Sequence, residues 1–430
     1  MTIIGALFFI FGFVTWLNGA LIPFLQIVCE LTESQALFVA FSFYIAYVVM
    51  ALPMSFLLDK VGYKKAMSLG LVLIGLGCLL FIPAASTREF SLFLLAQFVM
   101  GSGLTILQTA SNPYVVKIGP ENTAAVRISI MGILNKFAGF LAPIVFTALV
   151  LKDFKGVNAQ FMATLSEAAR AEKIEALSNA LIQPYVGMAL VLFVLAILLH
   201  FSKLPELTME GEEQIDATAL LSESSGTAAA KTLWQYPHLL LGVVALFFYV
   251  GVEVIAGDTI GLYGSQLGVA NATSLTSYTM AFMMIGYVMG LLLIPRVISQ
   301  VQALSVSAIL GLVLSIALIF ADNQSTALAS ALWGWSGIAV VPNSVAILAV
   351  LGFANAMVWP AVWPLALAGL GQLTARGSAL LIMGISGGAI LPVVYGKLSE
   401  AFTPQSAYWL LVPCYAFILF YALKGHQLKS

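Results

Sequence analysis

Charged residues are scarce in this chain, which has 430 residues of which only 9% are Asp, Glu, Lys or Arg. Soluble domains carry roughly 25%, whereas here 61% of the residues are hydrophobic and the mean hydropathy is +1.02. The formal net charge of −1 offers no basic surface for nucleic acid. The scarcity of charge therefore indicates an integral protein of the lipid bilayer, without a nucleic-acid partner.

Cysteine and histidine are also rare, with three of each. Cys29, Cys78 and Cys414 stand in or beside separate apolar segments and form no CxxC or Cys/His cluster, so we interpret them as packing residues. The sequence contains no nucleophile–base pair, metal-ligand spacing or phosphate-binding glycine loop. It predicts a protein that is not an enzyme and needs no cofactor, with Na⁺ considered only as a coupling ion.

Long apolar runs fill the sequence, and a membrane-spanning helix needs roughly 20 such residues. The first six runs lie at 3–28, 36–58, 65–84, 90–116, 126–151 and 183–201. Six more lie at 239–267, 275–298, 302–321, 345–370, 377–399 and 405–423. We therefore predict an all-α membrane protein with 12 transmembrane helices in two six-helix halves.

One polar segment separates the two halves. It contains "EGEEQIDATALLSESSGTAAAK", which is acidic, rich in Ser and Ala and without apolar periodicity, as is typical of a flexible linker. We predict an N-terminal bundle at 1–201, a cytoplasmic linker at 202–237 and a C-terminal bundle at 238–430. Most Lys and Arg residues fall on the linker's side of the membrane, so the positive-inside rule predicts that both termini are cytoplasmic.

A charged loop between spans two and three reads "SFLLDKVGYKK". Its Asp59, Lys64 and Lys65 resemble the inner-loop signature of major facilitator transporters, although Ser55 stands where that signature begins with Gly. The resemblance implies a gating role, in which the carboxylate meets a helix end or a base of the neighbouring helix. The alternative is that these charges only set the topology.

Polar side chains at membrane depth are costly, so each is a candidate functional residue. Thr105, Gln108 and Asn112 follow i, i+3, i+7 spacing and share one face of span four. Amides donate and accept hydrogen bonds, which suits a ligand with many hydroxyl groups. Hydrogen bonding between helices is the alternative. Pro113 frees a backbone carbonyl near Thr109, which could serve an ion or only permit a kink.

Span five carries Asn135 and Lys136 in "MGILNKFAG". An ammonium group midway along a span is not expected to face lipid. Two interpretations stay open for Lys136: its side chain snorkels to the membrane surface, or it acts as a fixed internal cation that neutralises a carboxylate or replaces a coupling ion.

Span seven carries Glu253 and Asp258 in "FYVGVEVIAGDTIGLYG". Five residues on an unbroken helix point these two side chains about 140° apart. The four glycines of this stretch would let the helix bend or unwind beside a site. We expect Glu253 to face the cavity, and Asp258 to act as a gate or to be exposed to water.

Span ten reads "GFANAMVWPAVWPLALAGLG". Asn355, Trp359 and Trp363 recur at i, i+4, i+8, which places an amide and two indoles along one side of a helix. Pro360 and Pro364 are expected to bend the helix there. Sugars present an apolar C–H face and a rim of hydroxyls, so this combination predicts a sugar-binding surface. The alternative is that the tryptophans lie at the membrane interface.

Several stretches resemble the fucose–galactose–glucose symporter branch of the major facilitator superfamily. They are "WLNGALIPFLQ", "LQTASNPYVVKIGPENTAAVR", "FYVGVEV" and "SALLIMGISGGAILPVVYG", and the likeness covers nearly the whole chain. The resemblance implies a major facilitator fold and sugar uptake coupled to a cation gradient, through alternating access of two rocking halves.

Two acids of the resembled fucose permeases are missing here. Their span-one acid corresponds to Gly19, directly after Asn18, and their span-four acid corresponds to Gln108. The departure resembles the sodium-dependent glucose/galactose transporters of the same branch. Oxygen atoms of Asn18, Gln108, Thr109 and Asn112 would suit a sodium ion, so the resemblance favours sodium over a proton.

We therefore expect a bacterial inner-membrane transporter, a monomer, that imports a neutral hexose by cation symport. One alternative is a proton-coupled symporter of the N-acetylglucosamine or fucose type that uses Glu253 or Asp258. Uniport and a drug-type exporter are further alternatives. Sugar-binding candidates are Asn18, Gln108, Asn112, Asn135, Glu253, Asn355, Trp359 and Trp363, and coupling candidates are Asn18, Gln108, Thr109, Lys136, Glu253 and Asp258.

Overall fold

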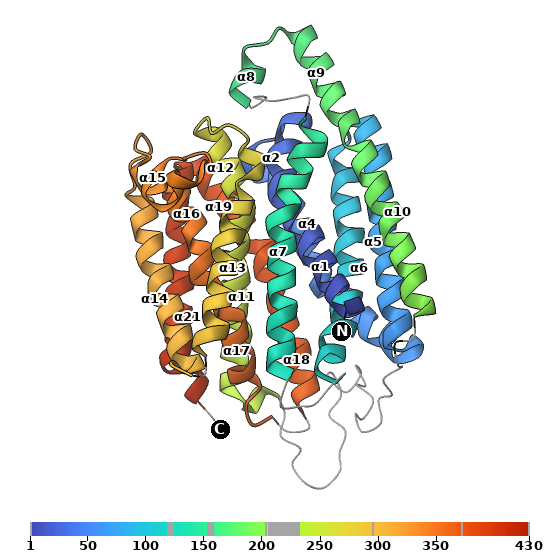
Figure 1. Cartoon of the computed structure of the whole chain (residues 1–430), viewed down its shortest axis with the longest axis vertical. Coiled ribbons are helices and arrows are strands. Elements are labelled where there is room, and N and C mark those ends of the chain that lie inside the picture. The colour runs from blue at the N-terminus through green and yellow to red at the C-terminus, as the bar shows by residue number, and fades with distance from the viewer. Residues whose placement is uncertain are drawn as a thin grey trace.

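The computed structural model describes residues 2–117, 124–152, 159–202, 204, 233–294, 296–370 and 373–428. Every regular element in these ranges is a helix. Twelve stretches are long and apolar enough to cross a membrane, and Figure 1 shows the first six beside the last six. The predicted twelve-span, all-α architecture is confirmed. Most of the predicted linker, at 203 and 205–232, lies outside the described residues.

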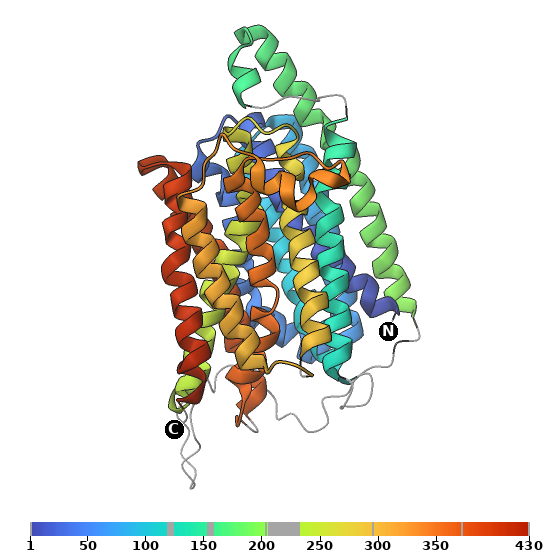
Figure 2. The same ribbon diagram turned by 60° about the vertical axis from the view of Figure 1, so that its left-hand side comes forward.

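The first six spans contain most of the helices up to residue 201. They are α1 (Thr2–Trp16) with α2 (Asn18–Val28), α3 (Glu33–Ala36) with α4 (Phe38–Val61), α5 (Tyr63–Thr87), α6 (Phe90–Lys117), α7 (Ala124–Val150) and α10 (Ile182–Phe201). Two further helices, α8 (Ala159–Ala163) and α9 (Glu167–Ala180), project from one end of the bundle (Figure 2). We call this end the α9 end.

The last six spans begin at Pro237. They are α11 (Pro237–Asp258) with α12 (Ile260–Gln266), α13 (Thr276–Leu293), α14 (Gln300–Ile319), α16 (Asn343–Asn355) with α17 (Val358–Leu367), α18 (Thr374–Met383) with α19 (Gly387–Ala401), and α20 (Pro404–Ala407) with α21 (Leu411–Leu423). The helix α15 (Ala327–Trp333) connects α14 to α16. Short 3₁₀ helices, among them η4 (Ala272–Ser274), fill several connections.

Span ten, which the sequence predicts over 345–370 with a bend at Pro360 and Pro364, is interrupted in the structure. It is broken between Asn355 and Val358, and α16 and α17 are separate helices. Pro360 explains the break, because a proline has no N–H for the carbonyl four residues earlier and its ring crowds that group. That carbonyl belongs to Ala356, which lies in the break.

Close helix crossings hold the first six spans together. A Cβ atom added at Gly12 of α1 would lie 1.8 Å from the Asn135 carbonyl oxygen of α7. Small residues allow such contacts between membrane helices, where lipid removes the usual hydrophobic drive for packing. The absence of a side chain at Gly12 therefore allows α1 to pack closely against α7 at Asn135.

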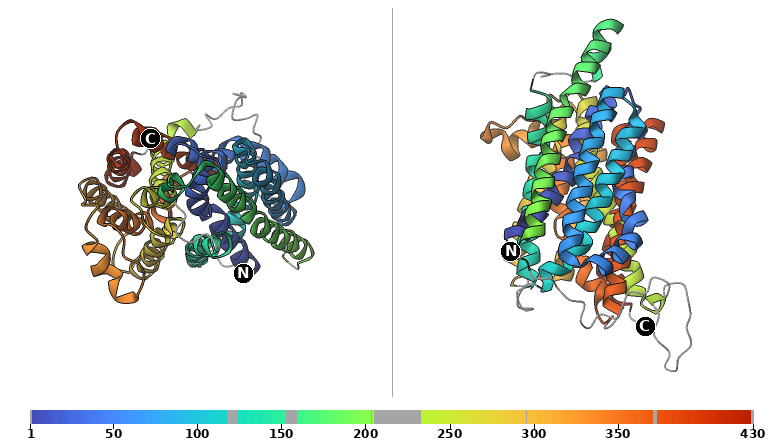
Figure 3. Two further views of the ribbon diagram at one scale, coloured as in Figure 1. Left: turned by 90° about the horizontal axis from the view of Figure 1, so that it is seen from above. Right: turned by 90° about the vertical axis from the view of Figure 1, so that its right-hand side faces the viewer.

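One flank of the bundle is formed by α10, seen in the right view of Figure 3. Six of its apolar side chains are more than half exposed: Leu190, Val191, Val194, Ile197, Leu198 and Phe201. An apolar strip of this kind is unfavourable in water but is expected against lipid chains. The exposed face of α10 thus agrees with a transmembrane location.

Candidate functional site

An ion pair joins the two sets of six spans at the middle of the bundle. The Lys136 Nζ of α7 lies 2.7 Å from the Glu253 Oε1 of α11, and each side chain is only 10% exposed. Removing two charges from water is costly, and a buried pair is tolerated only when the charges compensate each other. The structure therefore places Lys136 against a carboxylate rather than at the membrane surface.

Trp16, a residue that sequence reasoning did not select, completes this cluster. The Lys136 Nζ lies 4.8 Å from the centroid of the Trp16 ring, within the range of a cation–π contact. Glycines on both sides leave room for the indole. A Cβ atom added at Gly139 of α7 would lie 2.4 Å from a ring atom of Trp16, and one added at Gly257 of α11 would lie 2.3 Å from another. An indole at mid-span was visible in the sequence, but its partners were not.

Tyrosines gather around Glu253, and sequence reasoning missed them because they come from spans far apart in the chain. Four phenol groups, from four different spans, lie within electrostatic range of the Glu253 carboxylate: Tyr44, Tyr249, Tyr287 and Tyr415. Phenols donate and accept hydrogen bonds while presenting an aromatic face. The surroundings of Glu253 therefore suit a ligand with both hydroxyl groups and an apolar face.

The two indoles of span ten also lie in this region. The rings of Trp359 and Trp363 are stacked, with centroids 5.2 Å apart and planes 27° apart, and Trp359 lies 6.3 Å from the Tyr249 ring. Asn355 is separated from them by the helix break. It is fully buried, and its Oδ1 accepts a hydrogen bond of 2.8 Å from the Tyr415 hydroxyl.

The amides of the first half have different surroundings. Asn18 is 1% exposed and its Nδ2 has no hydrogen-bond partner among the described residues. The Asn135 Nδ2 donates to the Phe8 carbonyl at 3.4 Å, which links α7 to α1.

The polar residues of span four lie in α6. Gln108 is partly exposed, and the Thr109 hydroxyl donates to the Thr105 carbonyl. The side chain of Asn112 lies outside the described part of the chain.

Gly19 lies where α2 meets the second half of the protein. An added Cβ would be 2.0 Å from the Thr276 Oγ1 and 2.9 Å from the Gly257 carbonyl oxygen. That hydroxyl donates a hydrogen bond of 2.7 Å to the same Gly257 carbonyl. No side chain fits at position 19 in this arrangement, so the glycine has a packing function here, whatever ion is transported.

Asp258 is more deeply buried than the sequence suggested. Its side chain has no exposed surface, and neither carboxyl oxygen has a hydrogen-bond partner within the described ranges. It follows Gly257, the residue against which Gly19 packs. The expectation of a water-exposed Asp258 is therefore wrong for this conformation.

Hydrogen bonds between the two halves close the α9 end. The Glu33 Oε2 accepts from the Ser399 hydroxyl at 2.5 Å and from the Gln266 amide at 3.0 Å. The Glu400 carboxylate accepts from the Ser34 N–H at 2.9 Å and from its hydroxyl. We call these five residues the α9-end latch. They escaped sequence reasoning because polar residues at the ends of membrane spans are common.

Disrupting the α9-end latch should open this end of the protein. We expect Glu33→Ala to shift the population toward an open form by about tenfold or more, because hydrogen bonds to a charged group contribute about 1.5–3 kcal/mol. The measurement is the distance between spin labels at Thr87 and Phe402, with the native cysteines replaced. Glu172→Ala, at an exposed acid of α9, is the control, and identical distance distributions for both variants would contradict the assignment.

The predicted gating residues lie at the end of the bundle opposite the α9 end, and the structure describes the side chains of two of the three. The Lys64 Nζ donates a hydrogen bond of 2.7 Å to the Ser202 carbonyl at the end of α10. Lys65 is exposed, and the side chain of Asp59 lies outside the described residues. Lys64 therefore contacts the end of α10, while the contact expected of the Asp59 carboxylate is not tested, and the gating role of the loop stays a prediction.

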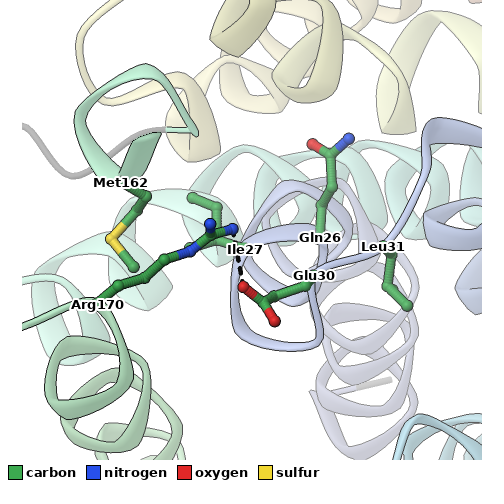
Figure 4. A pocket seen from close by; sticks show the side chains of 6 residues that line it. All are labelled: Gln26, Ile27, Glu30, Leu31, Met162 and Arg170. Carbon is green, nitrogen blue, oxygen red and sulfur yellow. Dashed lines mark ion pairs between the residues drawn. The ribbon is translucent and has the colours of Figure 1, made fainter. Parts of the chain in front are cut away.

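A cavity of about 200 Å³ lies at the surface of the α9 end, away from the Lys136–Glu253 pair. It is lined by Gln26, Ile27, Glu30, Leu31, Met162 and Arg170. Figure 4 shows the Arg170 guanidinium directed at the Glu30 carboxylate, at 2.8 Å. Both side chains are about half exposed, so this pair contributes little stability. The cavity is distinct from the site predicted between the halves.

Known membrane transporters are similar to this chain over nearly its whole length. The model of the Major Facilitator Superfamily matches residues 4–392. The glucose/galactose transporter of Brucella abortus is 34% identical over 99% of this chain and 94% of that protein. The L-fucose-proton symporter of Escherichia coli is 27% identical over 92% of this chain and 86% of that protein. The crystal structure of the transporter FucP in the outward conformation has a TM-score of 0.71 at 26% identity, covering 98% of this chain and 97% of that one.

Proposed function

The chain belongs to the major facilitator superfamily, in its fucose, galactose and glucose transporter branch, and on this premise we propose that it imports a neutral hexose together with a cation. The observation that carries the proposal is the ion pair between Lys136 and Glu253, which joins the two halves at mid-membrane. In this superfamily, substrates bind at the midplane between the halves. A hexose is proposed because the Brucella abortus relative bears the name glucose/galactose transporter.

The proposed sugar site surrounds that pair. Charged groups make the strongest hydrogen bonds to hydroxyls, so Lys136 and Glu253 would hold the polar rim of the sugar. The stacked indoles of Trp359 and Trp363 would cover its apolar face. The amides of Asn18, Gln108 and Asn135 are further proposed ligands, as is Asn112 by its place in the sequence. Asn355 would act by holding the Tyr415 hydroxyl.

The proposed cycle uses residues 1–201 and 238–430 as two rocking units in the bacterial inner membrane. With both termini in the cytoplasm, the α9 end faces outward. The α9-end latch then keeps the sugar from returning to the outside. The protein would work as a monomer, because one chain supplies both sides of the site.

Two cations are candidates, and they make different demands. Sodium needs several oxygen ligands, for which the sequence offered Asn18, Gln108, Thr109 and Asn112 where the resembled permeases have acids. A proton needs only one carboxyl group, provided that water reaches this group in turn from each side of the membrane. Asp258 is a buried carboxyl group without a hydrogen-bond partner in the described structure. This observation supports the proton as the alternative to sodium.

Uptake into proteoliposomes tests the function. We expect labelled glucose or galactose to accumulate when a cation gradient is imposed, because symport couples the sugar to the movement of the ion. The experiment compares a sodium gradient, a proton gradient and no gradient, with N-acetylglucosamine and fucose as further substrates. Equilibration without accumulation would indicate uniport, and no sugar uptake under any gradient would contradict the proposal.

A further inference from the structure

The core of the protein contains a second acid that the sugar site does not use. We infer that Asp258 is the proton-binding site of the symport, occluded in this structure beneath the contact between Gly19 and Thr276. The inference rests on the proposed sugar symport and adds the identity of the cation and the residue that carries it.

The burial of Asp258 is the first argument. The side chain has no exposed surface, and neither of its oxygens has a hydrogen-bond partner in the described part of the protein. An ionised carboxylate without a compensating partner is strongly disfavoured in such a place, and it takes up a proton instead. The neutral acid is the form that this conformation accommodates.

The charges around Asp258 give no compensation. The charged group that acts on it is Glu253, five residues earlier on the same helix, which adds repulsion. The base Lys136 of α7 is already paired with Glu253 at 2.7 Å. With Lys136, Glu253 and a protonated Asp258, the centre of the described structure is electrically neutral, as a membrane interior requires.

Tyr44 of α4, in the opposite half, lies within electrostatic range of Asp258. Its ring packs on α19, since an added Cβ at Gly388 would lie 3.2 Å from the Tyr44 Cγ. The Tyr44 hydroxyl is buried and, like Asp258, has no hydrogen-bond partner among the described residues. Two polar groups without partners, one from each half, thus lie where the halves meet.

The neighbouring oxygens favour a proton over sodium at this place. The Gly257 carbonyl accepts from the Thr276 hydroxyl at 2.7 Å. The Thr259 hydroxyl donates to the Ile255 carbonyl and lies 3.0 Å from the Tyr408 hydroxyl. These oxygens are engaged within the protein, whereas a sodium ion would need several of them as ligands.

The contact at Gly19 explains how the proton is trapped. Gly19 of α2 packs directly on Gly257 and Thr276, which are joined by a hydrogen bond, and Gly257 directly precedes Asp258 in α11. When the α9 end is open, this contact is broken and Asp258 can take a proton from outside. Closure then buries the neutral acid, and opening at the other end releases the proton to the cytoplasm.

The variant Asp258→Asn separates proton coupling from sugar binding. Asparagine keeps the size of the neutral acid but cannot release a proton. We expect sugar exchange between the two sides of a proteoliposome to continue at a rate within about threefold of the wild type. Accumulation driven by a proton gradient should fall at least tenfold, and sugar-induced proton uptake, followed with a pH dye inside the vesicles, should disappear.

Controls distinguish failure of the inference from failure of the proposed function. Glu89→Gln, at an exposed acid of a loop, should leave accumulation and proton uptake unchanged. If the wild type transports no sugar, the proposed function fails. If the wild type accumulates sugar only with sodium, or if Asp258→Asn still accumulates it with protons or loses exchange, the inference is overturned while sugar transport stands.

Discussion

Replacing either partner of the Lys136–Glu253 pair is expected to lower sugar uptake by about 100-fold or more. Removing one member of a buried ion pair leaves the other charge uncompensated, which costs about 3–5 kcal/mol, and each 1.4 kcal/mol is a factor of about ten. The pair is 90% buried and joins the two halves, so the cost falls on the closed conformation. Initial rates of labelled glucose uptake for Lys136→Gln and Glu253→Gln measure the effect.

The double variant and a second ion pair are the controls. Lys136→Gln combined with Glu253→Gln leaves no buried charge and should transport better than either single variant. Arg170→Gln breaks the half-exposed pair with Glu30, where about 0–1 kcal/mol is expected, and should transport like the wild type. Near-normal uptake in both single variants would contradict a central role for the pair.

A single methyl group at position 19 should also stop the transport cycle. In Gly19→Ala the new Cβ would lie 2.0 Å from the Thr276 Oγ1 and 2.9 Å from the Gly257 carbonyl oxygen. Overpacking of this kind costs about 1–3 kcal/mol. We expect uptake to fall about 10- to 100-fold, because the α9 end no longer closes.

The same spin labels at Thr87 and Phe402 show whether closure is what fails. In Gly19→Ala the longer distance of the open form should dominate. Gly187→Ala is the matched control, because an added Cβ there meets no atom within 4 Å, and both its uptake and its distance distribution should be unchanged. A Gly19→Ala protein that closes and transports normally would show that the contact with Thr276 is not tight in the membrane.

The transmembrane spans could be predicted because their cause is local. A run of about 20 apolar residues is sufficient to place a helix in a bilayer, and all twelve predicted runs overlap a span in the structure. The branch of the superfamily was also recognisable from short stretches such as "WLNG" and "LQTA". The bend predicted at Pro360 and Pro364 is a break in the structure, and Pro360 explains it through its effect on the Ala356 carbonyl.

The candidate site was predictable residue by residue, but not as an arrangement. Lys136 stood out as an unexplained ammonium and Glu253 as an unexplained acid, yet 117 residues separate them. Trp16 and the four tyrosines near Glu253 carried no pattern, because each belongs to the site only through the packing of its own helix. Asn355 followed the right spacing with Trp359 but lies beyond a helix break.

The sequence by itself determined that this protein crosses the membrane with twelve spans, because hydropathy acts along the chain and needs no partner. It also singled out the few polar residues that lipid does not explain. Only the tertiary structure decided that Lys136 neutralises Glu253, that Asp258 is left without a partner, and that Gly19 must be a glycine. The reason is that the cost of a buried charge or of an added methyl group depends on which distant atoms surround it.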